Sequence, residues 1–204
     1  MTRSIAIIGA GGFAREVLWL LEDLGVAGQV GGFFETDAHW QAREVAGLPV
    51  RPSSQLDISW DAVIAVGDPV ARDEILRTLP DGIRFPSYIH PSVRRGPRID
   101  LGEGAVVCAG SILTCDINIG RHVHLNLGTT VGHDCILEDF VTTAPSVNIS
   151  GRCTLGRHTY IGTNACLREG LQVHAGSVIG MGAVLVGQPD GPGTFVGNPA
   201  RKRQ

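Results

Sequence analysis

Aromatic residues and long apolar stretches are scarce in this 204-residue chain. Phe, Trp and Tyr make up 5% of it, and charged residues make up 18% with a net charge of −3. No segment approaches the ~20 consecutive apolar residues of a membrane span, and no basic stretch followed by an apolar signal core opens the chain. Neither half has a basic stripe with interleaved aromatic residues, which disfavours nucleic-acid binding. We therefore expect a cytoplasmic protein.

Closely paired cysteines are also missing. The chain has five cysteines but no CxxC motif, so the spacing typical of zinc ribbons and thiol redox sites is absent. In a cytoplasmic protein we expect reduced thiols packed in the core rather than disulfides. The five are Cys108, Cys115, Cys135, Cys153 and Cys166.

The chain does have an aliphatic residue at every sixth position from Leu101 to Leu185. Fourteen of these fifteen residues are Leu, Ile or Val, the exception being Thr143, and the residue four positions further on is mostly small or β-branched. An amphipathic helix repeats near 3.6 residues and a half-buried strand at 2, whereas a period of six indicates short strands separated by turns. The frame extends back to Ile89. Three hexads per triangular coil predict a parallel β-helix with a period of about 18 residues and roughly five coils.

Residues 1–86 lack the hexad and have the pattern of alternating strands and helices. The apolar run 4–8 meets a glycine turn and then a helical pattern that ends at Gly25. Further strands are expected at 29–34 and 62–66, and a helix at 70–79. These βα units predict a small, Rossmann-like parallel sheet. We expect three parts: an α/β domain at 1–86, the β-helix at 87–188 and a tail at 189–204.

The first strand is followed by a glycine motif. Gly9, Gly11 and Ala14 fit the G-x-G-x-x-G/A spacing, in which backbone N–H groups at a helix N-terminus accept a phosphate. The loops 9–13, 35–37 and 67–68 would lie together at the carboxyl edge of the sheet, where open α/β folds bind ligands. A nucleotide is the expected ligand. The alternatives are glycines that merely allow tight packing and an NAD(P) site, for which fewer than ninety residues is short.

The best candidate for chemistry in the β-helix is His133, followed by Asp134. Both lie at a turn of the hexad and should point outward, where a carboxylate neighbour can orient a histidine general base. The 18-residue period stacks Cys115, His133, Gly151 and Glu169. The Gly151 N–H could therefore polarise an acyl carbonyl beside the base. Cys115 could be a nucleophile, but no neighbouring motif lowers its pKa and we interpret it as a packing residue.

Metal binding is a second hypothesis for the histidines. Three histidines on a trimeric β-helix bind zinc in the γ-class carbonic anhydrases, so His122, His124 and His133 form a candidate set. Their spacing does not match that family's paired ligands. We expect no metal, and turn histidines in contact with solvent.

From the motif Ile7-Ile8-Gly9-Ala10-Gly11-Gly12 to the terminal Gly197-Asn198-Pro199-Ala200, and through the hexads between them, the chain resembles the bacterial sugar O-/N-acyltransferases. These include sialic acid O-acetyltransferases and UDP-4-amino-sugar N-acetyltransferases of glycan biosynthesis. The resemblance implies a left-handed β-helix and a homotrimer. It also implies acetyl-CoA in the groove between neighbouring subunits, and a nucleotide-linked sugar on the N-terminal domain.

The resemblance also implies roles for individual residues. His133 would be the general base with Asp134 as its acidic partner. Residues expected to bind the nucleotide sugar are Gly9, Gly11, Gly12, Phe13, Glu35, Thr36, Gly67, Asp68 and Asn126. Residues expected to lie along CoA are Thr142, Gly151, Gly162, Thr163, Asn164, Gly180, Gly182, Asn198, Pro199 and Arg201.

Five positions depart from the family pattern. Phe13 and Thr142 stand where histidine occurs in other members, Glu35-Thr36 replaces a paired acidic motif, and Asp68 replaces a frequent Asn. We expect an acetyl-CoA-dependent N-acetyltransferase that acts on an amino group of a nucleotide-linked sugar. The 4-amino group is the expected position. The alternatives are an O-acetyltransferase of the sialic acid type and a non-catalytic trimer that binds nucleotide sugars.

Overall fold

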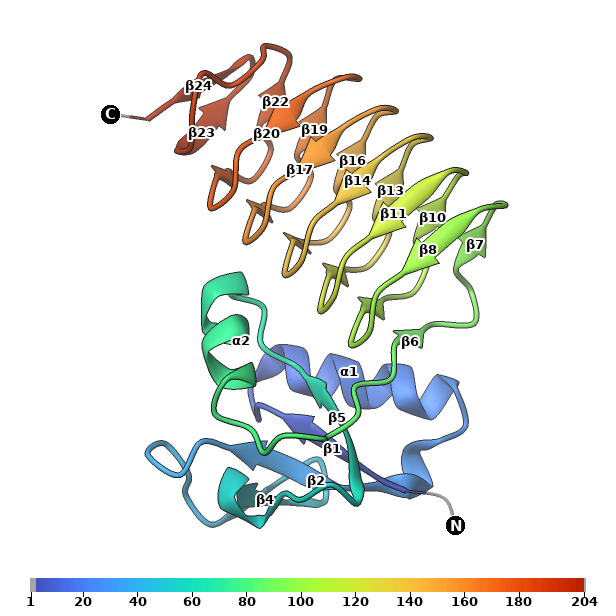
Figure 1. Ribbon diagram of the computed structural model, residues 1–204, viewed down its shortest axis with the longest axis vertical. Helices are drawn as coiled ribbons and strands as arrows, with labels where there is room; N and C mark the ends of the chain where they lie inside the picture. The colour runs from blue at the N-terminus through green and yellow to red at the C-terminus, as the bar shows by residue number, and fades with distance from the viewer. Residues whose placement is uncertain (1–2, 204) are drawn as a thin grey trace. The chain divides into compact units, whose positions relative to one another are not determined.

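A computed structural model describes residues 3–203 and divides into two compact units, Met1–Tyr88 and Ile89–Gln204. Figure 1 shows a small α/β unit at the N-terminal end of the chain and a ladder of short strands that makes up the remainder. No helix in the described range has the length and apolar content needed to cross a bilayer.

The first unit is a five-stranded sheet with the order β3-β4-β2-β1-β5. Strand β1, an interior strand next to the edge strand β5, is buried from Ile5 to Ile8 and pairs in parallel with both β2 and β5. The strands are β1 (Ser4–Ile8), β2 (Val30–Glu35), β3 (Arg43–Val45), β4 (Leu48–Pro52) and β5 (Trp60–Ile64). The helices are α1 (Gly12–Asp23) and α2 (Pro69–Leu76), with 3₁₀ turns at Ala27–Gln29 and Ser53–Gln55.

The hydrophobic pattern explains most of this unit. Helix α1 buries one apolar stripe, including Val17 and Leu21, as its 3.6-residue spacing predicts. The hairpin of β3 and β4 was not predicted, because its sequence carries two prolines and charged residues in place of a clear alternation. Strand β4 extends the parallel sheet beside β2, whereas β3 pairs antiparallel with β4. The sheet is therefore parallel except at this edge.

The second unit is a left-handed parallel β-helix, which confirms the β-helix expected from the hexads and the handedness that the resemblance implied. Its strands, two or three residues each, stack on three faces. Face 1 contains β6 (Tyr88–Ile89), β9 (Val106–Val107), β12 (His124–Leu125), β15 (Thr142–Thr143), β18 (Tyr160–Ile161) and β21 (Val178–Ile179). Face 2 contains β7 (Arg94–Arg95), β10 (Ile112–Leu113), β13 (Thr130–Val131), β16 (Asn148–Ile149), β19 (Cys166–Leu167) and β22 (Val184–Leu185). Face 3 contains β8 (Ile99–Leu101), β11 (Ile117–Ile119), β14 (Ile136–Leu137), β17 (Thr154–Leu155) and β20 (Gln172–Val173).

The 18-residue period is visible in the strand pairing. Leu125 pairs with Val107 on one side and with Thr143 on the other, and the same interval recurs on the other two faces. The inward residues form one continuous core, and Thr143 is buried there although it is polar. Its hydroxyl lies 2.8 Å from that of Thr129, which satisfies both groups.

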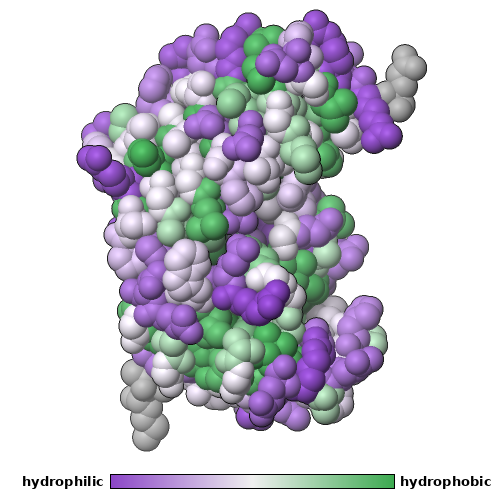
Figure 2. All heavy atoms as spheres, turned by 180° about the vertical axis from the view of Figure 1, so that it is seen from behind, coloured by the Kyte–Doolittle hydropathy of each residue, from purple (hydrophilic) through white to green (hydrophobic). Residues whose placement is uncertain are grey.

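The last part of the chain ends this regular winding. Strand β23 (Thr194–Gly197) continues face 1 in parallel with β21, and β24 (Ala200–Lys202) then turns back antiparallel to β23. On the side of the molecule shown in Figure 2, the end of the β-helix near the C-terminus is mostly hydrophilic, whereas apolar and polar residues are interspersed along the coils.

Candidate active site

His133 and Asp134 occupy the corner at which the chain passes from face 2 to face 3. His133 Nδ1 lies 2.6 Å from Asp134 Oδ2, and the two side chains are 50% and 58% exposed. An ionised carboxylate only accepts hydrogen bonds, so this contact places the ring proton on Nδ1 in the neutral tautomer. The arrangement leaves Nε2 as the basic nitrogen. This is the geometry that a general base requires.

Gly151 lies directly against the His133 ring. A Cβ atom built on Gly151 would lie 2.6 Å from Nε2 and 2.7 Å from Cε1 of His133, closer than any real side chain could approach. Glycine is therefore required here by the approach of the imidazole. The backbone of residue 151 and the basic nitrogen of residue 133 border the same space.

Backbone hydrogen bonds hold this corner in register from coil to coil. The N–H of Asp134 donates to the carbonyl of Cys115 (3.2 Å), and the N–H of Arg152 donates to the carbonyl of His133 (2.7 Å). In the next coil, the N–H of Gly170 donates in the same way to the carbonyl of Gly151 (2.9 Å). The stacking of residues 18 apart thus fixes the position of His133 between its neighbours.

Cys115, one coil before His133, has the character of a protonated thiol. Hydrogen bonding to Asp116 is the main cause that raises the pKa of Cys115, with burial and the charge of Asp134 adding to it. A nucleophilic cysteine needs the opposite shift. The structure therefore favours the packing role over the nucleophile.

Sequence reasoning missed a charged pair beside this corner. Arg98 donates through Nε and Nη2 to the two carboxylate oxygens of Asp116, the second bond being 2.7 Å long. This hydrogen bonding lowers the pKa of Asp116. The pair borders a surface cavity of about 370 Å³ that also includes Asp134 and Ile136. The signal was present in the sequence, since residues 98, 116 and 134 are 18 apart.

The residues expected along CoA form a second group at a different corner. The chain passes from face 1 to face 2 at 126–129, 144–147, 162–165 and 180–183, so the predicted residues there stack on one another. Backbone bonds from Asn164 to Pro145 (3.0 Å) and from Gly182 to Thr163 (2.8 Å) hold this stack. Of the residues expected along CoA, this corner holds Gly162, Thr163, Asn164, Gly180 and Gly182, whereas Gly151 lies at the His133 corner. Asn126, which was expected to bind the nucleotide sugar, also lies at this second corner. Within one chain it is separated from His133 by the strands of face 2.

Four other residues expected along CoA lie elsewhere: three are in the tail and one is on face 1. Asn198 and Pro199 form the exposed turn between β23 and β24, and Arg201 is exposed on β24. Arg201 borders a cavity of about 260 Å³ together with Asp190 and Lys202. Thr142 lies on β15 and is 4% exposed.

In the first unit, the predicted loops meet at the carboxyl edge of the sheet. Strand β1 lies between β2 and β5, and the N–H of Gly9 donates to the carbonyl of Phe34 (2.7 Å). Gly9 has a φ of +110°, and a Cβ there would lie 3.0 Å from the carbonyl oxygen of Ala65. Gly11 and Gly12 are exposed and Phe13 is half-buried, at the start of α1. No side chain caps the α1 N-terminus.

The acidic residues at this edge are engaged within the fold. Arg43 donates two hydrogen bonds to Glu35, at 2.7 and 2.9 Å. Thr36 Oγ1 lies 2.8 Å from His39 Nδ1. Asp68 Oδ1 accepts the N–H groups of residues 70 and 71, so this carboxylate is the N-cap of α2. The pairing of Glu35 with Arg43 could not be seen from the sequence, because the β3–β4 hairpin was not predicted, whereas an Asp followed by Pro is a common start of a helix.

The edge also contains a buried cation that sequence reasoning missed. Arg72 on α2 is 0% exposed, and its Nη1 donates to the carbonyls of Val66 (2.7 Å) and Gly67 (3.4 Å). Burial lowers the pKa of Arg72 to about 9, so the guanidinium stays charged at neutral pH. In the sequence, Arg72 has no feature that separates it from the exposed Arg77 one turn later.

The zinc hypothesis required three histidines that the structure does not bring together. His122 is buried between faces 3 and 1 and stacks on Phe140, with ring centres 5.2 Å apart. His124 is 1% exposed on β12, and His133 is at a different corner. Among residues 3–203, no three His, Cys, Asp or Glu side chains are grouped as metal ligands.

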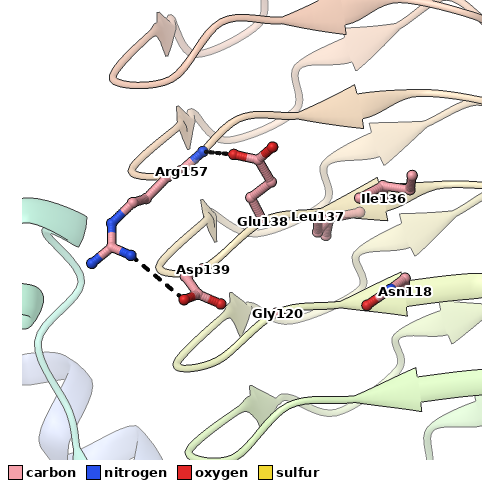
Figure 3. A pocket seen from close by; sticks show the side chains of 7 residues that line it. All are labelled: Asn118, Gly120, Ile136, Leu137, Glu138, Asp139 and Arg157. Atoms are coloured by element: carbon pink, nitrogen blue, oxygen red, sulfur yellow. Dashed lines mark hydrogen bonds and ion pairs between the residues drawn. The ribbon is translucent and has the colours of Figure 1, made fainter.

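A second surface cavity lies on the opposite margin of face 3. Its volume is about 340 Å³, and its border includes Asn118, Ile136 and Glu138. Figure 3 shows Arg157 bound both to Glu138, through its backbone N–H at 2.8 Å, and to Asp139, through its guanidinium at 3.5 Å. These bonds tie consecutive coils together. We interpret the bonds of Arg157 as structural, since they join consecutive coils and neither His133 nor Asp134 lines this cavity.

An α/β unit that carries a glycine loop, followed by a β-helix with an outward His–Asp pair beside a glycine, is the framework of the hexapeptide-repeat acyltransferases. The sequence of residues 4–79 matches the family of the PglD N-terminal domain. The chain belongs to the bacterial sugar acyltransferases of the left-handed β-helix class, as the resemblance predicted.

Three relatives illustrate the match. GDP-perosamine N-acetyltransferase of Escherichia coli O157:H7 is 31% identical over 145 residues, which span 65% of this chain and 65% of that protein. The acetyltransferase domain of PglB from Neisseria gonorrhoeae FA1090 is 33% identical with a TM-score of 0.88, covering 99% of this chain and 100% of that one. PerB from Caulobacter crescentus, solved with CoA and GDP-perosamine, is 28% identical with a TM-score of 0.89, covering 98% and 97%.

Proposed function

We propose that this protein transfers an acetyl group from acetyl-CoA to the amino group, at the 4-position, of a nucleotide-linked sugar, with His133 as general base. The relatives support the substrate classes. The gonococcal domain has been solved with acetyl-CoA, and the Caulobacter enzyme with CoA and GDP-perosamine. The α/β unit would hold the nucleotide, and residues 189–204 would approach the adenine end of CoA.

The observation that carries the proposal is the contact between His133 and Gly151. Nε2 is the basic nitrogen because Asp134 binds Nδ1, and Nε2 is the atom closest to the position of a Cβ on residue 151. A base and a backbone amide therefore border one space. Acyl transfer needs both, one to remove the proton of the nucleophile and one to stabilise the oxyanion.

The proposed reaction is a direct transfer. The amine attacks the thioester carbonyl of acetyl-CoA while His133 Nε2 takes its proton, and Asp134 stabilises the imidazolium that forms. The tetrahedral oxyanion accepts a hydrogen bond from the Gly151 N–H. The carbon–sulfur bond then breaks, and the imidazolium returns a proton to the CoA thiolate. The products are the N-acetylated sugar and CoA.

The proposal includes a homotrimer, because one chain holds the two groups of site residues at different corners. His133 and Gly151 lie between faces 2 and 3, whereas Asn126, Gly162 and Gly180 lie between faces 1 and 2. In a trimer of prisms, a corner of one subunit can face a corner of the next. We therefore propose that the base of one copy and the CoA-binding corner of its neighbour form each site.

Replacement of His133 tests the mechanism. We predict that His133→Ala lowers kcat by ~10² or more, within the range that a general base contributes. Acetyl-CoA binding, measured by calorimetry, should be retained. The Caulobacter enzyme supports this expectation, since variants with one histidine replaced by Asn or Ala were solved with both ligands. His174→Ala, which removes an exposed histidine on another corner, is the matched control.

Near-normal turnover of His133→Ala would exclude His133 as the base. The acceptor is tested separately, with UDP-, GDP- and dTDP-linked 4-amino sugars and their 4-hydroxy counterparts, by following release of the CoA thiol. We expect turnover of an amino sugar and none of its hydroxy counterpart. Turnover of the hydroxy sugars alone would assign the protein to the O-acetyltransferases.

A further inference from the structure

Arg72 is a buried charge that the proposed reaction does not use. Desolvation of a buried guanidinium is unfavourable, so its hydrogen bonds matter for the local fold. Its Nη1 donates to the backbone carbonyls of Val66 and Gly67, in the loop that follows β5. In the same loop, the carboxylate of Asp68 accepts the N–H groups of Val70 and Ala71 at 2.9 and 2.8 Å.

These contacts determine the direction of two peptide groups. In a trans peptide the C=O and the N–H that share its plane point in opposite directions. The carbonyls of Val66 and Gly67 point toward the buried guanidinium. The N–H groups of Gly67 and Asp68 therefore point away from it. Two successive N–H groups that point the same way form a concave donor site of the kind that binds anions.

The loop after β5 lies at the sheet edge where the nucleotide is expected to bind. Strand β5 pairs with β1 along its whole length, so the loops that follow the two strands lie at the same edge of the sheet. The loop after β1 leads into the N-terminus of α1, which no side chain caps. The charge of Arg72 adds positive potential beneath the same edge, in a region of low dielectric.

We propose that Arg72 is a positioning residue for the acceptor: it holds the peptides of the Gly67–Asp68 loop in the orientation that receives the diphosphate of the nucleotide-linked sugar. This inference rests on the proposed function, since it concerns the nucleotide part of that substrate. It assigns Arg72 no contact with the substrate and no part in the chemical step.

The test compares Arg72→Met with Arg72→Lys and with Arg77→Met. Methionine keeps much of the volume without charge or donors, whereas lysine keeps the charge but cannot form the same fork. Arg77, on the same helix, is 68% exposed and paired with Asp73, so Arg77→Met is the matched control. Binding of UDP, GDP and dTDP and of acetyl-CoA is measured by calorimetry, together with KM and kcat for the acceptor.

We expect Arg72→Met to weaken nucleoside diphosphate binding by about tenfold, equivalent to ~1.4 kcal/mol, and to raise the acceptor KM in proportion. The acetyl-CoA Kd and kcat should not change, Arg72→Lys should lie between Arg72→Met and the native protein, and Arg77→Met should match the native protein. Faster amide hydrogen exchange in 62–70, without faster exchange in β1, should accompany the loss. If Arg72→Met does not fold, Arg72→Lys carries the test.

Two outcomes separate this inference from the proposed function. If the native protein binds a nucleoside diphosphate and the folded Arg72 variants bind it equally well, the role of Arg72 is refuted and the proposed function stands. If the native protein binds no nucleoside diphosphate, the nucleotide-sugar substrate is wrong, and the inference fails with it.

Discussion

At the scale of single residues, the candidate site depends on the absence of a side chain at Gly151. His133 needs room for its ring, and only a residue without a side chain provides it in the neighbouring coil. The 18-residue period predicted that the two residues would be adjacent, and the structure shows that adjacency. Their catalytic roles stay predictions.

The first residue-scale prediction concerns that space. In Gly151→Ala, the added methyl group would overlap His133 Nε2 and displace the ring from its place beside the backbone amide. We predict a fall in kcat of tenfold or more, a part of the ~10²–10⁴ that a general base contributes. The circular dichroism spectrum should be unchanged, because the atoms nearest to the added Cβ belong to the half-exposed His133 ring, which can move without disturbing the backbone. Gly170→Ala, one coil further on at an exposed corner with no atom near its Cβ, gives a comparison, although its φ of +75° adds some strain.

Not every residue-level expectation could be read from the sequence. Glu35 was predicted to contact the acceptor, but its carboxylate is bound by Arg43, eight residues later, through a turn of the chain that has no sequence signature. Arg72 was not singled out, because burial of an arginine depends on which face of α2 meets the sheet. Local patterns identify residue types and spacing, whereas these pairings depend on tertiary contacts.

At the scale of secondary-structure elements, the N-terminus of α2 contributes both to the stability of the helix and to the loop expected to bind the acceptor. Its N-cap Asp68 is one of the predicted acceptor residues, yet the structure gives that carboxylate a structural task. The same side chain satisfies two N–H groups that would otherwise lack partners at the helix start. A substitution at residue 68 therefore changes folding as well as the loop.

We predict that Asp68→Ala lowers the free energy of unfolding by about 1 kcal/mol, the usual effect of removing an N-cap. Asp68→Asn should lose much less, because asparagine caps helices about as well as aspartate. Urea unfolding followed by circular dichroism measures both. Equal losses in the two variants would show that the charge of Asp68, and not its capping oxygen, stabilises the helix.

The elements differ in how well the sequence predicted them. Strand β1 was expected at 4–8 and is found at Ser4–Ile8, and the two βα units were found with shifts of a few residues at their ends. The β-helix could be predicted from one periodic signal. Because this signal recurs in every coil, each further hexad strengthens the same prediction. The hairpin of β3 and β4 has no such repetition, and its edge position tolerates prolines and charges.

At the scale of the whole molecule, the proposed site needs residues from two copies of the chain. Ile112 on face 2 and Ile136 on face 3 are 41% and 46% exposed, and they lie on the two faces that meet at the His133 corner. A contiguous apolar patch on a protein surface marks a site of protein contact, whereas single exposed apolar residues are common. The proposed trimer would cover such faces and place a second chain beside His133.

We predict that the native chain, of 21.6 kDa, sediments as a trimer and that Ile136→Glu shifts the population to lighter species with a loss of turnover. A buried glutamate without a partner at an interface is strongly unfavourable. Ile58→Glu is the control, because Ile58 is 60% exposed in the other unit and should leave the mass unchanged. A native monomer with full turnover would contradict both the trimer and the shared site.

The terminal hairpin gives the β-helix a defined length. A ladder of parallel strands has the repeat of a cross-β fibril, so an open edge can act as a template for another chain. At face 1 the chain instead turns at Gly197–Ala200 and runs β24 back against β23. The last strand presents the exposed cations Arg201 and Lys202, which oppose pairing with a further strand. We therefore expect the hairpin to disfavour end-to-end pairing of copies at face 1.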